Sequence, residues 1–126
     1  MFELTIHTSF AGAHSLRDYP GKCRQLHGHN WRVAVTVCGK KLNSLGMVID
    51  FAYLKRELNQ VIETLDHQYL NELAAFTSAN PTSENIAVYI CNELQAKLKS
   101  IDANIRVSKV TVWESDTAAV TYYQEE

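Results

Sequence analysis

Three histidines near the start of the chain have the spacing of a metal site. His27 and His29 stand two positions apart in the stretch CRQLHGHN, at the entrance to a segment with strand character. In an extended chain residues i and i+2 point to the same face, so these two imidazoles can converge on one ion. His14, in FAGAHS, can supply a third ligand if the two flanking strands pair as an antiparallel hairpin. Three histidines with one open position are typical of catalytic zinc, whereas a lone HxH pair on a surface strand often binds nothing.

Cys23 lies four residues before His27, between Lys22 and Arg24. Cations beside a cysteine favour the thiolate, which makes Cys23 a candidate base, nucleophile or further metal ligand. The residue types alone do not choose among these three roles. The other two cysteines lie among apolar neighbours and are expected to be small core residues; they are Cys38 and Cys91.

Two acidic residues and two further histidines complete the set of candidates. Asp66 and His67 are adjacent in LDHQYLN, where a carboxylate can orient an imidazole for proton transfer, although a helix cap or surface pair is the commoner interpretation. Glu114 follows an apolar run at the end of a predicted strand. If Glu114 is buried it needs a partner, such as the two adjacent N–H groups of a ring edge; otherwise it is a solvated strand end. His7 lies on the other strand face from His14 and is expected at the surface.

The segments that position these side chains read as strands at both ends of the chain. Apolar residues recur with a period of two, which predicts half-buried strands. The four predicted strands cover residues 2–10, 31–39, 105–113 and 118–123. In the third of them the apolar parity slips between Val107 and Val110, which predicts a β-bulge.

Two helices are predicted between the second and third strands. Asp50 is the predicted N-cap of the first, and Thr82 or Ser83 that of the second, each followed by apolar residues at helical spacing. The resulting order ββααββ predicts an α+β fold, a four-stranded sheet with both helices on one face. Four strands cannot close a barrel and leave two open edges, so we expect a homo-oligomer.

The composition fits one globular domain over residues 1–126. Hydrophobic residues make up 46% of the chain and charged residues 21%, so a packed core is possible. The net charge of -2 and the lack of a basic run argue against nucleic-acid binding, but a small anionic substrate remains compatible. No run of 18 apolar residues occurs, so no membrane span is expected. Three scattered cysteines and no signal-peptide pattern predict a reducing, cytoplasmic compartment.

The chain resembles the 6-pyruvoyl-tetrahydropterin synthase family from about Phe2 to Tyr122. Six stretches carry the resemblance, namely FAGAHSL, CRQLHGHN, GMVIDF, LDHQYLN, NPTSENIA and VWES. The C-x3-HGH spacing with an upstream AH and a downstream LDH makes it specific. Within the family the chain is most similar to the bacterial branch that forms 6-carboxy-5,6,7,8-tetrahydropterin in queuosine biosynthesis.

The resemblance implies a fold and a reaction. The fold is the tunnelling fold, with four antiparallel strands and two helices per subunit. Its barrels form by oligomerisation, commonly as a homohexamer of two trimers with active sites between subunits. The reaction is a zinc-dependent lyase step on 7,8-dihydroneopterin triphosphate, which releases triphosphate and acetaldehyde.

The resemblance also implies a role for each candidate residue. The Zn2+ ligands would be His14, His27 and His29. The catalytic residues would be Cys23 as base, with Asp66, His67 and Glu114 as a relay, and Glu114 would also bind the pterin. Lys22 and Arg24 are the nearest candidates to receive the triphosphate.

Three alternatives remain open on the sequence. A 6-pyruvoyl-tetrahydropterin synthase shares every motif and retains the substrate side chain. A non-catalytic metal-binding module would need no thiol base. A zinc hydrolase would be expected to carry a carboxylate close to the HGH motif, and none lies within a few residues of it.

Overall fold

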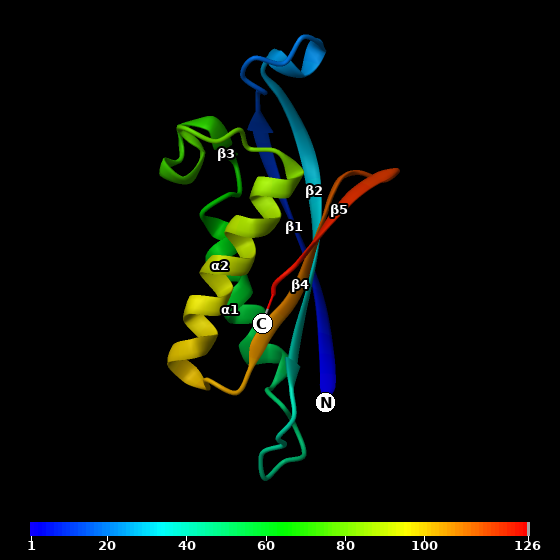
Figure 1. Cartoon of the computed structure of the whole chain (residues 1–126), viewed down its shortest axis with the longest axis vertical. Coiled ribbons are helices and arrows are strands. Elements are labelled where there is room, and N and C mark those ends of the chain that lie inside the picture. Colours follow the sequence, from blue (N-terminus) through cyan, green and yellow to red (C-terminus); the bar gives the residue numbers. More distant parts are fainter. Residues whose placement is uncertain (126) are drawn as a thin grey trace.

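The computed structural model of the chain describes residues 1–125, which form one mixed sheet and two helices (Figure 1). The strands are β1 Phe2–His14, β2 His27–Gly39, β3 Gln68–Tyr69, β4 Arg106–Ser115 and β5 Ala118–Tyr123. The helices are α1 Phe51–Glu63 and α2 Ser83–Ile101, and single 3-10 turns cover Lys22–Arg24, Leu70–Glu72 and Ala74–Phe76. The strand order in the sheet is β3-β1-β2-β4-β5.

The predicted α+β fold is confirmed, with one correction to the sheet. The four long strands pair antiparallel as expected, but β3 adds a fifth, which runs parallel to β1. Two residues are too short a segment to show any periodicity, so the prediction of a purely antiparallel four-stranded sheet was wrong here. The first two strands are also longer than predicted, because their ladder continues to the pair His14 and His27.

The predicted β-bulge is confirmed in β4. The pairing of β2 with β4 slips by one residue, and Ser108 is the extra residue between Val107 and Lys109. Two side chains satisfy the disturbed backbone, since Gln95 accepts from the Val107 N–H at 2.9 Å and Gln124 donates to the Val107 carbonyl at 2.8 Å. The bulge is therefore held by α2 and by the C-terminal end of the chain.

Both predicted helix starts are confirmed. The Asp50 side chain accepts from the Ala52 N–H at 2.8 Å, and the Thr82 hydroxyl accepts from the Asn85 N–H at 3.1 Å. Thr82 and not Ser83 is thus the N-cap of α2. Neither helix in residues 1–125 is long and apolar enough to cross a membrane.

The helices cover one face of the sheet, and the core lies between the two layers (Figure 1). The core side chains of β1 are Ile6 and Phe10, and those of β2 begin at Trp31. His14 shares the parity of the first pair, and the HGH histidines share the parity of Trp31. The histidines therefore lie on the helix-covered face, at the end of the core. Cys91 is buried as expected, but Cys38 is only half-buried.

Candidate metal and active site

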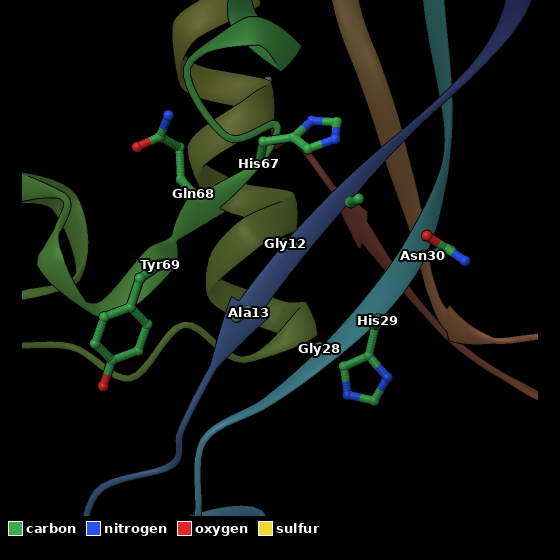
Figure 2. Close-up of a pocket in the computed structure, with 9 residues that line it drawn as sticks. Gly12, Ala13, Gly28, His29, Asn30, His67, Gln68 and Tyr69 are labelled. Carbon is green, nitrogen blue, oxygen red and sulfur yellow. The ribbon is translucent and has the colours of Figure 1, made fainter.

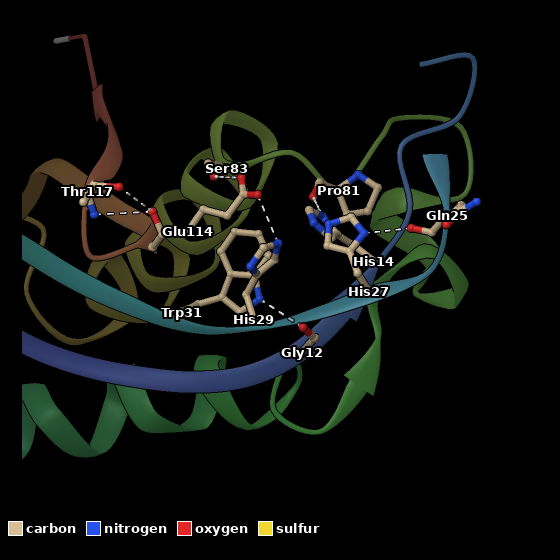
Figure 3. Close-up of polar contacts among 11 residues, drawn as sticks. Gly12, His14, Gln25, His27, His29, Trp31, Pro81, Ser83, Glu114 and Thr117 are labelled. Atoms are coloured by element: carbon tan, nitrogen blue, oxygen red, sulfur yellow. Dashed lines mark hydrogen bonds and ion pairs between the residues drawn. The ribbon is translucent and has the colours of Figure 1, made fainter. Parts of the chain in front are cut away.

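The end of the β1–β2 ladder brings the three histidines together (Figure 3). His14 stands directly opposite His27, and His29 stands opposite Gly12, so all three imidazoles meet on one face. One donor atom from each lies within 4.8 Å of the others and of a carboxylate oxygen of Glu114. The expected convergence of the three histidines is thus present, and Glu114 joins them as a fourth possible metal ligand that the sequence interpretation did not include.

Backbone carbonyls orient two of these imidazoles. His14 Nδ1 lies 2.8 Å from the Pro81 carbonyl and His27 Nδ1 lies 2.7 Å from the Gln25 carbonyl. A carbonyl only accepts, so each Nδ1 carries the proton and each Nε2 keeps its lone pair. The Nε2 atoms of His14, His27 and His29 are buried without a hydrogen-bond partner among the described residues. Buried imidazole nitrogens that face one another without a hydrogen-bond partner are costly, and a bound cation would satisfy them.

Burial favours the neutral form of two of the three histidines. His14 is 1% exposed, and burial lowers its pKa below the ordinary value of histidine, although the Pro81 carbonyl opposes this shift. Burial also lowers the pKa of His29, against the pull of the Glu114 carboxylate. Neutral imidazole is the form that ligates a metal ion, so both shifts favour binding.

Trp31 forms the floor of the cluster. Its ring meets His14 and His29 edge-on, with centroids 5.0 and 5.1 Å apart. The indole N–H donates to the Gly12 carbonyl at 3.2 Å, which fixes the ring between the core and the imidazoles. Because Trp31 is fully buried, the cluster sits on a rigid apolar base.

Glu114, at the end of β4, closes the side of the cluster away from β1. Its Oε1 lies 3.0 Å from His29 Nε2, an ion-pair distance, but the direction is not that of a hydrogen bond. Ser83 donates to its Oε2 at 3.4 Å from the start of α2. Its side chain is 36% exposed, so one edge of the carboxylate remains open to a ligand.

Cys23 lies beside the cluster on the 3-10 turn Lys22–Arg24. It lines a cavity of about 270 Å3 together with ligand candidates from β2 and β4. The lining residues are Lys22, Cys23, Gln25, Leu26, His27, His29 and Glu114. The thiol therefore borders the possible metal position without belonging to the ligand group. Of the two cations expected to receive a triphosphate, only Lys22 lines this cavity.

His67 lies at the edge of the sheet beside β1 and away from His29 (Figure 2), and Asp66 precedes it. The backbone of Ala11 donates to Asp66 Oδ1 at 3.0 Å and accepts from the His67 N–H at 2.6 Å. His67 adopts a left-handed backbone (φ 57°), and its Nδ1 pairs with Asp66 Oδ2 at 3.0 Å. The pKa of Asp66 is lowered, first by the Ala11 N–H and then by His67. The pair exists as predicted, but within one chain it faces a different cavity from that of Cys23.

This second cavity has a volume of about 510 Å3 and a floor of small residues. Its lining residues are Ala11, Gly12, Ala13, Gly28, His29, Asn30, His67, Gln68 and Tyr69. His67 is 81% exposed, so its imidazole is available to a molecule outside the chain.

Comparison with known proteins places the chain in a family. The sequence model of 6-pyruvoyl tetrahydropterin synthase matches residues 3–125. The chain is 39% identical over 121 residues to the 6-carboxy-5,6,7,8-tetrahydropterin synthase of Synechocystis, covering 91% of this chain and 88% of that protein. It is 38% identical over 109 residues to the human 6-pyruvoyl tetrahydrobiopterin synthase, covering 83% and 72%. The chain belongs to the 6-pyruvoyl tetrahydropterin synthase family.

The fold comparison agrees with this assignment. The structure of Caenorhabditis elegans 6-pyruvoyl tetrahydropterin synthase superposes with a TM-score of 0.84 at 31% identity, covering 98% of this chain and 96% of that one. The predicted family and the prediction of an enzyme are therefore confirmed, and the chain is a pterin-processing member of the family. The two activity names occur at nearly equal identity, so identity does not separate the two products.

Two supports of this family site escaped the sequence interpretation. Trp31 follows the HGH motif at the same spacing of two, so strand parity could have placed it beneath the histidines. Pro81 could not have been found, because it acts through its backbone carbonyl on a histidine 67 positions away.

Proposed function

We propose that this family member is a zinc-dependent lyase that makes 6-carboxy-5,6,7,8-tetrahydropterin from 7,8-dihydroneopterin triphosphate. Acetaldehyde and triphosphate leave, one water molecule is consumed, and the product enters queuosine biosynthesis. The observation that carries the proposal is the set of three convergent, unpartnered Nε2 atoms beside a thiol. The name of the Synechocystis relative supports the choice of product.

Zn2+ fits the donor set. Three neutral imidazoles and a nearby carboxylate are ligands that zinc accepts, and the ligands proposed here are His14, His27 and His29. When bound, zinc would acidify the side-chain hydroxyl groups of the substrate and the adjacent C–H bond.

Four residues perform the proton transfers and orient the substrate. Cys23, as thiolate, accepts and returns the side-chain protons, since it borders the cavity of the histidines. Asp66 orients His67, which relays protons to and from Cys23. Glu114 accepts the adjacent N–H groups of the pterin ring through its open carboxylate edge and joins the relay.

Oligomerisation completes the site in this proposal. Within one chain the Asp66–His67 pair faces outward at a sheet edge, and the sheet has a second open edge at β5. Pairing of such edges between subunits closes a barrel, so that no strand edge is left without a hydrogen-bond partner. We infer a homohexamer of two trimers in which the relay of one subunit meets the thiol of its neighbour.

The second candidate function is 6-pyruvoyl-tetrahydropterin synthesis, in which triphosphate leaves and the side chain stays. The human relative at 38% identity carries that activity in its name. A non-catalytic metal-binding module is a weaker alternative, because it gives no purpose to a thiol beside the ligands. The proposed context is a single domain over residues 1–126 in the cytoplasm, where free cysteines such as Cys23 persist.

A product assay tests the proposal. Purified protein with quantified zinc is mixed with dihydroneopterin triphosphate, and acetaldehyde, triphosphate and the pterin product are measured together. We expect about one zinc per chain and equal yields of acetaldehyde and triphosphate. Triphosphate without acetaldehyde would establish the pyruvoyl alternative, and full activity without metal would contradict the zinc assignment.

Replacing Cys23 by Ala separates catalysis from metal binding. Loss of a general base lowers kcat by about 10²- to 10⁴-fold. Zinc content should stay at the parent level, because the thiol is outside the ligand group. Cys38→Ala is the matched control, since Cys38 is also half-buried but lies at the other end of β2, and it should leave kcat unchanged.

A further inference from the structure

The three residues after β1 are clamped by a distant loop. Ser15, Leu16 and Arg17 continue from His14 without a strand partner, yet the backbone groups of Ser15 and Arg17 are bonded by side chains of the segment that joins β3 to α2. Two asparagines of this segment, Asn71 and Asn80, make these bonds, and neither was singled out by the sequence.

Asn71 pairs with Ser15 as a strand residue would. Its Oδ1 accepts from the Ser15 N–H at 2.9 Å, and its Nδ2 donates to the Ser15 carbonyl at 2.8 Å. Asn71 is only 8% exposed, so water cannot readily replace its two hydrogen bonds to Ser15. A single side chain thus satisfies both backbone groups of one residue.

Asn80 repeats this arrangement two residues further on. Its Oδ1 accepts from the Arg17 N–H at 2.9 Å, and its Nδ2 donates to the Arg17 carbonyl at 3.1 Å. The Arg17 guanidinium bonds back to the loop, at 2.7 Å to the Phe76 carbonyl and 3.2 Å to the Asn71 carbonyl. The two amides and the guanidinium therefore hold residues 15–17 against the connection between β3 and α2.

Leu16, between the two clamped residues, is bonded to the 3-10 turn Lys22–Arg24 that carries Cys23. In an extended segment the N–H groups of successive residues point to opposite sides, so those of residues i and i+2 point to the same side. The N–H groups of Ser15 and Arg17 point to the asparagines, and the Leu16 N–H donates to the Cys23 carbonyl at 2.7 Å on the other side. Of the residues on the turn, Cys23 is thus the one that the clamped segment holds directly.

We propose that Asn71 and Asn80 are positioning residues for Cys23. By fixing Ser15 and Arg17 they set where Leu16 presents its N–H, and thereby where the thiol stands over the histidine cluster. Neither amide touches the cavity of Cys23 and the histidines, so the effect is indirect. The role in turnover rests on the proposed function, in which Cys23 is the base.

Misplacement of a reacting group by about 1 Å can cost about 100-fold in rate, so a loosened turn should act mainly on kcat. Asn71→Ala and Asn80→Ala should each lower kcat at least about tenfold with KM within about threefold of the parent. Zinc content should not change. In hydrogen–deuterium exchange, uptake should rise in peptides covering residues 15–24. The rate of Cys23 alkylation by iodoacetamide, followed by peptide mass mapping, should change with it.

Gln124→Ala is the matched control. It also removes a side-chain amide that bonds to the rest of the fold, at 2.8 Å to the Val107 carbonyl, 2.8 Å to Gln95 and 3.4 Å to the Cys91 thiol, but at the other end of β4. It should lower the midpoint of urea unfolding by about as much as the asparagine variants do, and leave kcat, KM and Cys23 alkylation at parent values.

Three outcomes overturn the proposal: parent-like kcat in both asparagine variants, loss of zinc together with kcat, or an equal loss of kcat in Gln124→Ala. If the parent forms no product from the pterin triphosphate, the proposed function fails, and alkylation and exchange still decide the positioning role. Unchanged Cys23 alkylation and exchange in the asparagine variants would then refute it, and a change confined to residues 15–24 would support it.

Discussion

Four of the five histidines of this chain occupy two opposite environments on β1 and its neighbours. His14 is 1% exposed and stands with two other imidazoles whose Nε2 atoms lack a hydrogen-bond partner in residues 1–125. His67 has a side chain that is 81% exposed and an Nδ1 already paired with Asp66. In the buried region, which is the cluster of His14, His27 and His29, the imidazoles converge but their Nε2 atoms have no hydrogen-bond partner within the part of the chain that the structure describes. In the edge region, which is the pair Asp66 and His67, the two side chains bond to each other and the imidazole is exposed. In the proposed function, one chain would hold the metal by itself and offer its relay to another subunit.

The charges of the two regions differ for physical reasons. Burial lowers the pKa of His14, so this histidine keeps the neutral form that binds a cation. Donation from the Ala11 N–H lowers the pKa of Asp66, so the edge keeps a charged carboxylate beside His67. A neutral acceptor set and a charged orienting group are what metal binding and proton relay respectively require.

The largest expected effect comes from breaking the buried region. His27→Ala removes one of the three proposed imidazole ligands, so bound zinc should fall to a small fraction of the parent level. Since metal supplies several kcal/mol of transition-state stabilisation, activity should fall by about a thousandfold or more. Added zinc at 100 times its Kd should stabilise the parent by about 2.7 kcal/mol and the variant by much less. Metal analysis and thermal melts with and without zinc measure both.

His67→Ala is the control for that prediction. It removes an imidazole from the edge region, so activity should fall while zinc content and the zinc-dependent rise in Tm stay at the parent level. Equal zinc loss in both variants would show that the two regions are not separate.

A mixture of two inactive variants tests whether the regions meet between subunits. Cys23→Ala and His67→Ala each lack one half of the proposed site. If a site takes its thiol from one subunit and its relay from the next, random mixing should restore about one quarter of the parent activity. Refolding the variants together and assaying turnover against each variant alone measures this. No gain on mixing would place both groups in one subunit and contradict the inferred assembly.

The sequence predicted the buried region better than the edge region. Parity along a strand put His27 and His29 on one face, and the hairpin put His14 opposite, because local geometry fixes both. It could not predict that Glu114 would approach His29, since that depends on the β2–β4 register. That register changes by one residue only at the bulge around Ser108, which was visible as a parity slip but lies at the other end of β4 from Glu114.

The edge region lay beyond such reasoning for a different reason. The two-residue β3 pairs with Gly12 and Ala13, and the left-handed His67 donates its N–H to the Ala11 carbonyl, 56 positions away. No local pattern reports a contact at that separation. The asparagine clamp on Ser15 and Arg17 was hidden for the same reason, because asparagine in a loop reads only as a turn residue.

A smaller effect is expected from the charge of Asp66. Its pKa is lowered in the folded chain, so its contribution to stability is present above the ordinary carboxyl pKa of about 3.9 and is lost as the pH falls through the folded value. Asp66→Asn should therefore lower the urea midpoint of metal-free protein at pH 6. The two proteins should converge as the pH approaches about 2. A constant difference at every pH would show that the carboxylate charge is not what holds the edge.

The smallest effect is expected at His7, which belongs to neither region. His7 is exposed on the face of the sheet that the helices leave uncovered, where its ring stacks on Trp113 with centroids 6.4 Å apart. It shares a strand with His14 but has the opposite parity, so it cannot reach the cluster. His7→Ala should leave zinc content and kcat unchanged and shift the free energy of unfolding by no more than about 0.5 kcal/mol. Because this variant removes an imidazole from the same strand, a drop in bound zinc would mean that strand parity does not select the ligands, and the separation of the buried cluster from the other histidines would fail with it.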